Sequence, residues 1–258
     1  MPPLTLHTVI AKRVAGELRH RPDGRASARL LDEDPGSLYL GSTAPDIRIL
    51  TRWERQRTHF FDLHNFDRQD GVGALFEAYP ALARPAGLNP ATAVFVAGYI
   101  SHLVMDEIWI NDMYRPFFGP GSPQGGDVRA NIMDRAIQYE LDRQTRADRE
   151  AVSDIVKELA RTALEVEVGF IDKDTIARWR ALTMEAVNQP PDWAHFRYLA
   201  GRALRAAGLD GAQDYAEFLK TLPDLLAETT AYLTQERIEA FLEHSVKEAC
   251  EAIREYLG

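Results

Sequence analysis

The sequence has one cysteine in 258 residues, Cys250, so no disulfide forms within the chain, as is typical of a reducing compartment. It also lacks a basic start followed by an apolar run, which is the pattern of a signal peptide. The most apolar stretch, residues 91–110, contains His102, Asp106 and Glu107 and falls short of the roughly 20 apolar residues that span a bilayer. We therefore expect a cytoplasmic protein without a transmembrane segment.

Positive charge is also scarce in this chain. Lys and Arg number 30 against 39 Asp and Glu, which gives a formal net charge of −9 with neutral histidines. General nucleic-acid binding is disfavoured, because phosphate contacts require clustered basic side chains, and multivalent cations are more natural partners. Hydrophobic residues make up 45% of the chain, which excludes wholesale disorder and is enough for a sizeable core.

Strand patterns are missing, and helical periodicity dominates the chain. Residues 5–19 place apolar side chains on one face, and residues 72–83 can form a short helix. Asn89 and Pro90 have the residue types of an N-cap and a first helical position, so they predict a long helix to about residue 113. Asp127 similarly begins a helix that we expect to end near residue 146.

Glycine, proline and aspartate mark the expected interruptions between these helices. We expect a loop over residues 21–36 and an irregular segment over 37–50. Residues 149–257 are further amphipathic helices, and the expected breaks are near Asp172, Pro190-Pro191, Gly208 to Gly211 and Pro223. The sequence thus predicts an all-α, single-domain multi-helix bundle, with residues 1–148 as a helical core and 149–258 packed on it.

The clearest chemical signal is His102-Leu-Val-Met-Asp106 on the predicted long helix. A spacing of i and i+4 places both side chains on one helix face, one turn apart. The surrounding segment is apolar, and a carboxylate buried there costs several kcal/mol unless a cation or hydrogen-bond donors compensate it. A metal ion removes that cost, and so does a histidine–aspartate pair that satisfies itself inside the bundle.

Three further residues offer metal ligands on separate segments. Asp46 follows a proline in Gly41-Ser-Thr-Ala-Pro-Asp46, a setting that also suits a turn or an N-cap. His59 has aromatic neighbours that exclude water, and His7 lies near the apolar face of the first helix. Each of these histidines taken alone fits an ordinary core position. Together with His102 and Asp106 they form a set of imidazoles and carboxylates, the ligands that Zn²⁺ accepts.

At these residues the sequence resembles the zinc-dependent phospholipase C family, which is related to the S1/P1-type nucleases. The resemblance spans about residues 6–110 and is carried by Leu6-His7-Thr8-Val9-Ile10-Ala11, Gly41-Ser-Thr-Ala-Pro-Asp46, Thr58-His59-Phe60 and Gly98-Tyr-Ile-Ser-His102-Leu-Val-Met-Asp106. It implies an all-α fold of the phospholipase C/P1 nuclease type. It further implies that Asp46, His59, His102 and Asp106 hold one zinc ion, and that Asp106 bridges to a second ion held by His7.

Two departures from the family pattern stand out. Secreted members complete the second zinc site with a processed N-terminal residue, whereas here His7 follows six residues. Members with a third zinc use a histidine after the bridging aspartate and a later His-x-x-x-Glu, and the nearest matches here are Asp112, Asp134 and Gln138. A site on Asp112 and Asp134 would be rich in oxygen and suit a harder ion such as Mg²⁺, Ca²⁺ or Mn²⁺. These aspartates equally fit a solvated face or a helix cap. His64 is a further candidate ligand.

The resemblance implies phosphodiester hydrolysis of a small phosphoester or a phospholipid headgroup by a metal-bound hydroxide. Two adjacent cations lower the pKa of a shared water and neutralise the charge that develops on phosphoryl oxygens. Asp46 would act as a ligand and also orient or deprotonate the attacking water. One alternative is a non-catalytic metal-binding or scaffold protein that retains one site of the family. Another is a metal-dependent hydrolase with a different substrate chemistry.

Overall fold

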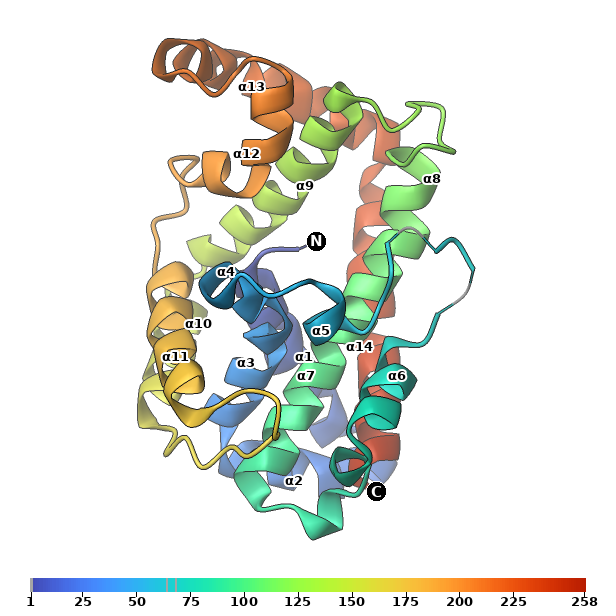
Figure 1. Ribbon diagram of the computed structural model, residues 1–258, viewed down its shortest axis with the longest axis vertical. Coiled ribbons are helices and arrows are strands. Elements are labelled where there is room, and N and C mark those ends of the chain that lie inside the picture. Colours follow the sequence, from blue (N-terminus) through green and yellow to red (C-terminus); the bar gives the residue numbers. More distant parts are fainter. Residues whose placement is uncertain (1, 64, 68) are drawn as a thin grey trace.

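The computed structural model describes residues 2–63, 65–67 and 69–258, which form an all-α bundle without a strand among them. Figure 1 shows α7 running through the middle of the molecule, with α14 from the end of the chain beside it. The all-α, multi-helix architecture expected from the sequence is thereby confirmed.

The helices follow one another along the whole chain. In chain order they are α1 (Leu4–His20), α2 (Arg25–Glu33), α3 (Pro35–Thr43), α4 (Arg48–Thr51), α5 (Gln56–His59), α6 (Gly71–Ala78), α7 (Pro90–Ile108), α8 (Arg115–Phe117), α9 (Val128–Ala147), α10 (Arg149–Arg161), α11 (Lys173–Val187), α12 (Phe196–Ala206), α13 (Ala212–Leu233) and α14 (Gln235–Leu257). Short 3₁₀ segments lie between some of them, including η2 (Ala44–Ile47), and a π-helical turn, η5 (Trp109–Tyr114), joins α7 to α8.

The expected loop over residues 21–36 and the irregular segment over 37–50 are wrong, because α2 and α3 lie there. Asp34 and Pro35, which resemble loop residues, begin a helix. The Asp34 carboxylate accepts a hydrogen bond from Ser37 N at 3.0 Å as the N-cap of α3, and Pro35 occupies its first turn. The break expected at Pro223 is also wrong, since α13 continues through that residue.

The continuous helical stretch Pro90–Phe117 is long and apolar enough by composition to cross a membrane, which differs from the sequence expectation. Of its apolar window, 89% is buried inside the structure. Core helices have the same composition, so the stretch is weak evidence for a membrane span. Its burial follows from its place between α1, α3 and α14, which all contact it.

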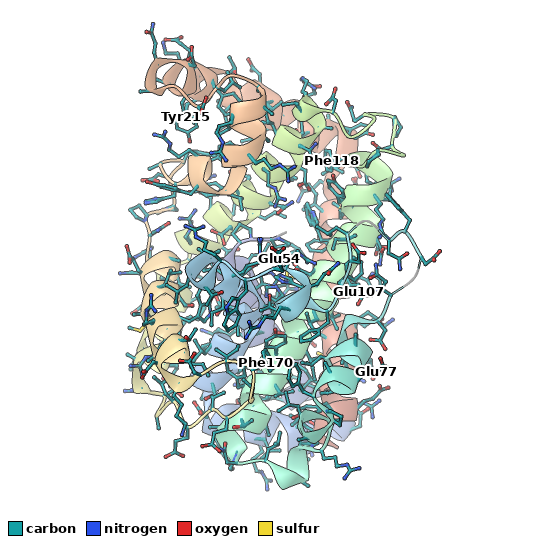
Figure 2. The ribbon with its side chains drawn as sticks, in the orientation of Figure 1. Glu54, Glu77, Glu107, Phe118, Phe170 and Tyr215 are labelled. Atoms are coloured by element: carbon teal, nitrogen blue, oxygen red, sulfur yellow. The ribbon has the colours of Figure 1, made fainter. Side chains whose placement is uncertain are left out.

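Two hydrophobic clusters build the interior. The larger one includes α1, α3, α7 and α14, while the second lies between α9, α12 and α13. Figure 2 shows their separation, with Tyr215 of the second cluster at one end of the molecule and Phe170 of the first well away from it. The candidate ligands of the first 110 residues lie on α1, η2, α5 and α7. Residues of α1, η2 and α7 belong to the larger cluster, and Phe60, which follows α5, packs against it.

Candidate metal centre

His102 and Asp106 lie one turn apart on α7, as the spacing predicts, and both are buried. Nε2 of His102 is 3.2 Å from Oδ2 of Asp106. Residues 92–103 are buried without interruption, so α7 carries this pair into the middle of the protein. A carboxylate in such surroundings needs a compensating charge or donors, because water does not reach it.

Two glycines bring α3 against α7 and thereby fix the orientation of the His102 ring. A Cβ at Gly41 would lie 2.0 Å from the carbonyl oxygen of Phe95, and one at Gly98 would lie 2.1 Å from that of Leu38. The close approach lets Nδ1 of His102 donate to the carbonyl oxygen of Ser42 at 2.8 Å. Since a carbonyl only accepts, the neutral ring has its proton on Nδ1 and presents the lone pair of Nε2 to Asp106.

His59 ends the short helix α5 and is oriented in the same way. Its Nδ1 lies 3.1 Å from Oγ1 of Thr58, and that hydroxyl itself donates to the carbonyl oxygen of Arg55 at 3.3 Å. Phe60 follows with a φ of 52°, a left-handed conformation that is rare for an aromatic residue. This turn ends α5 while Nε2 of His59 stays directed inward, 3.5 Å from Oδ2 of Asp106.

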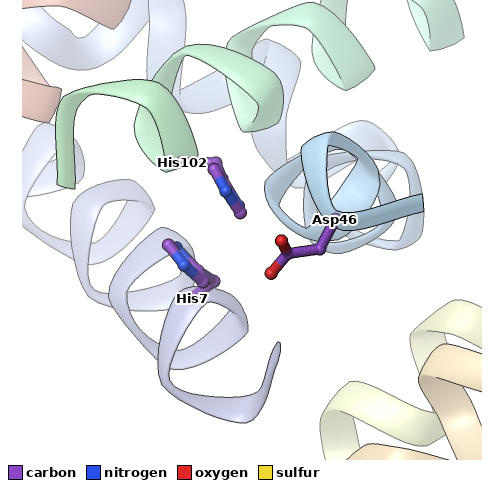
Figure 3. Close-up of side chains that lie close together, drawn as sticks. All are labelled: His7, Asp46 and His102. Atoms are coloured by element: carbon purple, nitrogen blue, oxygen red, sulfur yellow. The ribbon is translucent and has the colours of Figure 1, made fainter. Parts of the chain in front are cut away.

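His7 and Asp46 complete the arrangement from α1 and η2. The rings of His7 and His102 stack with their centroids 3.8 Å apart, and Nε2 of His7 is 3.5 Å from Oδ1 of Asp106. Oδ1 of Asp46 is 3.4 Å from Nε2 of His59. Figure 3 shows the Asp46 carboxylate pointing toward the imidazoles of His7 and His102. We refer to these five residues as the histidine–aspartate cluster.

The cluster contains buried polar atoms without a hydrogen-bond partner. They are Nε2 of His7, His59 and His102, Nδ1 of His7, and Oδ1 of Asp106. One ligand atom from each of His7, Asp46 and His102 lies within 4.8 Å of the others, and the same holds for His59, His102 and Asp106. Unpaired buried donors and acceptors are costly, and a divalent cation satisfies imidazole and carboxylate groups together. The donor set therefore fits a metal ion such as Zn²⁺.

Burial and neighbouring charges shift the pKa values of the residues in this cluster. Burial lowers the pKa of His59 to about 4, and burial together with the neighbouring His102 lowers the pKa of His7. Burial alone would raise the pKa of Asp106, but His102 and His7 outweigh it and hold that pKa well below its usual range. For His102, burial lowers the pKa, yet the Asp106 carboxylate outweighs it and the net shift is upward. An ionised carboxylate thus faces two imidazoles that favour their neutral, metal-binding form.

Arg55 also reaches the cluster, which the sequence interpretation did not anticipate. One of its terminal nitrogens, Nη2, lies 3.3 Å from Oδ2 of Asp106, and Nη1 donates to the carbonyl oxygen of Phe61 at 3.1 Å. Burial lowers the pKa of this guanidinium, and Asp106 opposes that shift. Its position four residues before His59 is the one sequence signal that links it to the site.

The expected oxygen-rich site on Asp112 and Asp134 is not assembled among the described residues. Asp112 lies in the π-helical turn with its side chain 49% exposed, and its carboxylate is 3.1 Å from Nδ1 of His244 on α14. Asp134 is buried on α9, where it accepts hydrogen bonds from Nε1 of Trp109 at 3.0 Å and Nε2 of Gln138 at 2.7 Å. Both hydrogen bonds go to Oδ1 of Asp134, and Nε of Arg135 lies 3.7 Å from its Oδ2. His64, a further candidate, lies outside the described residues.

Comparison with known proteins gives one match. The sequence model of a family described as zinc dependent phospholipase C matches residues 6–109. All five residues of the histidine–aspartate cluster fall within that segment. No curated protein and no solved structure matches the chain.

Proposed function

We propose that this protein is a metal-dependent phosphoric-ester hydrolase, a proposal supported by the match of the zinc dependent phospholipase C family model to residues 6–109. The histidine–aspartate cluster is its centre. The observation that carries the proposal is the convergence of three unpaired Nε2 atoms, from His7, His59 and His102, on the two oxygens of Asp106. Three separate helices supply these nitrogens, and none of the three has a hydrogen-bond partner among the residues that the structure describes.

A divalent cation bound here supplies a water of lowered pKa and neutralises phosphoryl charge. The chain's own contribution begins with Asp46, whose side chain is 19% exposed, against 4% or less for Asp106 and His59. Asp46 therefore reaches both the cluster and the solvent-accessible side. Its pKa stays below the usual range, because the interaction with His59 outweighs the effect of burial. A carboxylate that remains ionised suits the acceptance of a hydrogen bond from the attacking water, which it orients toward phosphorus.

Arg55 provides positive charge beside the cluster. Its guanidinium lies at Asp106 with its side chain 15% exposed, so it can donate to a phosphoryl oxygen as negative charge develops there. A small cavity beside His59 shares one lining residue, Ile110, with a larger cavity of about 520 Å³. Its walls include Arg115, Arg202 and Trp109. Arginines with apolar walls fit the organic part of an anionic phosphoester or a phospholipid headgroup, for which we propose an intracellular source.

A non-catalytic metal-binding protein is the second candidate. The engagement of Asp134 by Trp109 and Gln138 favours it, because those hydrogen bonds occupy one oxygen of a residue expected to bind a further metal ion. The two candidates differ in the number of ions held. Two ions per chain fit the in-line attack of a two-metal hydrolase, and a single ion fits the binding protein.

The test is hydrolysis of bis-p-nitrophenyl phosphate by protein stripped with a chelator and titrated with Zn²⁺. We expect no activity in the stripped protein, recovery with added zinc, and loss of activity in His59→Ala. His195→Ala is the matched control, because His195 lies beside α12 away from the cluster and should leave the rate unchanged. Zinc bound without any hydrolysis of this ester or of phospholipid vesicles would favour the binding protein instead.

A further inference from the structure

The first turn of α1 is capped by a residue from a distant part of the chain. The N-cap position of α1 is Pro3, which makes no side-chain hydrogen bond to the helix. The amide of Leu6 instead donates to Oδ1 of Asp142 on α9 at 3.0 Å. The first four amides of a helix have no partner within it, so an outside carboxylate that accepts one of them fixes where the helix begins.

Asp142 is buried together with a compensating cation. Asp142 is 4% exposed and Arg146 1% exposed, and Nε of Arg146 lies 3.0 Å from Oδ2 of Asp142. Arg146 also donates to the carbonyl oxygen of Pro190 at 3.1 Å. A buried ion pair of this kind is a weak source of stability, because desolvation of both charges offsets their attraction. The pair is therefore better explained by the segment that it holds in place, which is the first turn of α1.

The residue after Leu6 is His7, and among the three imidazoles of the cluster it is held differently. Nδ1 of His102 is bonded to the Ser42 carbonyl, and Nδ1 of His59 contacts the Thr58 hydroxyl. Within the described part of the chain, neither ring nitrogen of His7 has a hydrogen-bond partner. Its orientation consequently depends on the backbone of α1, on packing against the His102 ring at 3.8 Å and on the contact of Nε2 with Oδ1 of Asp106 at 3.5 Å.

We propose that Asp142 is a positioning residue for His7. By accepting the Leu6 amide it sets the first turn of α1, and the first turn sets the distance from the His7 ring to Oδ1 of Asp106. This role replaces the hydrogen bond to Nδ1 that orients the other two imidazoles. The expected effect on metal binding rests on the proposed function, whereas the positioning of His7 is a property of the metal-free protein.

The experiment compares Asp142→Asn with the double variant Asp142→Leu/Arg146→Met. Asparagine keeps an oxygen that accepts the Leu6 amide, whereas the double variant removes the acceptor without leaving an unpaired guanidinium in the interior. Leu204→Ala, in the second hydrophobic cluster on α12, is the control for a general loss of stability. His7→Ala identifies which bound ion depends on His7.

Two readouts are taken. In metal-free protein, NMR measures hydrogen exchange of the α1 first-turn amides and the ring chemical shifts of His7. The double variant should speed that exchange at least about tenfold and move the His7 signals, while Asp142→Asn and Leu204→Ala leave the His7 signals in place. In zinc titrations, the double variant should weaken the His7-dependent ion by about 10- to 100-fold, the usual effect of losing an outer-shell partner, and leave any other ion within about twofold.

The positioning role is overturned if the double variant keeps the wild-type His7 signals and amide exchange. It is equally overturned if Asp142→Asn behaves like the double variant, because the acceptor oxygen would then be irrelevant. A wild-type protein that binds no zinc, combined with displaced His7 signals in the double variant, would contradict the proposed function and leave the positioning role intact.

Discussion

Oδ1 of Asp106 lies 3.5 Å from Nε2 of His7. The other oxygen of the same carboxylate, Oδ2, faces Nε2 of His102 at 3.2 Å and Nε2 of His59 at 3.5 Å. Each oxygen thus has its own set of imidazoles, which is the arrangement that a carboxylate bridging two cations requires. On this geometry we base the proposal that Asp106 bridges two ions.

Substitution of Asp106 should therefore remove more metal than substitution of any single histidine. We expect Asp106→Ala to lose every ion that the wild-type cluster binds, and His7→Ala to lose only the ion next to Oδ1. Isothermal titration of stripped protein with Zn²⁺ measures the number of ions and their affinities. Full metal content in Asp106→Ala would show that the bridging assignment is wrong.

The contact between α3 and α7 leads to a second prediction. A methyl group at Gly98 would collide with the Leu38 carbonyl, so Gly98→Ala should destabilise the fold by about 1–3 kcal/mol or more. It should also weaken zinc binding about 10- to 100-fold, because α3 carries the Ser42 carbonyl that orients His102.

Gly16→Ala is the matched comparison for Gly98→Ala. Gly16 lies inside α1, and nothing approaches within 4 Å of the position that a Cβ would take there. Alanine should stabilise the helix at this position by about 0.5–1 kcal/mol. Chemical denaturation measures both free energies of unfolding. Equal stability of the two variants would contradict the close packing of α3 on α7.

The dependence of metal binding on pH follows from the pKa shifts of His102 and His59. The pKa of His102 in the metal-free protein is raised above 6.5, so this ring carries a proton at pH 6 that a cation must displace. His59, with a pKa of about 4, is already neutral there. Zinc affinity should therefore fall as pH drops below neutrality, and binding at pH 6 should release about one proton.

Calorimetry in buffers with different ionisation enthalpies counts the protons released on zinc binding. The proton count at pH 6 should decrease toward zero as the pH rises above the pKa of His102. A zinc affinity that does not change between pH 6 and pH 8 would contradict the upward shift of that pKa.

The thiol of Cys250 should not react with thiol reagents in the native protein. Its side chain is 2% exposed on α14, Sγ lies 3.7 Å from the Val14 carbonyl oxygen, and burial raises the pKa of the thiol to about 11. Thiolate is the reactive form, so at pH 8 a disulfide reagent such as dithionitrobenzoate should react only after denaturant unfolds the chain. Rapid stoichiometric labelling of the native protein would show that α14 does not cover this residue.

The parts of the centre that the sequence predicts are those with a local signature. His102 and Asp106 are one helical turn apart, and the turn alone places them on one face. His7, Asp46 and His59 carry no such signature and join the set only through their ligand chemistry and the family resemblance. The approach of these residues to α7 depends on tertiary packing, such as the contact that Gly41 and Gly98 allow, which residue spacing does not encode.

The mistaken expectations also have physical causes. Asp34-Pro35 serves as the start of a helix, although the same residue types commonly form turns. Asp134 has a ligand-like position on α9, yet the neighbouring Trp109 uses its carboxylate as a hydrogen-bond acceptor. Arg55 contacts Asp106 across 51 residues of sequence, and Asp142 contacts the Leu6 amide across 136 residues, so periodicity within a helix predicts neither contact.

Elemental analysis of protein purified without added metal tests the central claim most directly. The wild-type chain should retain at least one divalent ion, zinc above others, whereas His59→Ala/His102→Ala purified in parallel should retain none. Wild-type protein free of divalent metal, or equal metal content in the two proteins, would contradict the assignment of these imidazoles to a metal centre.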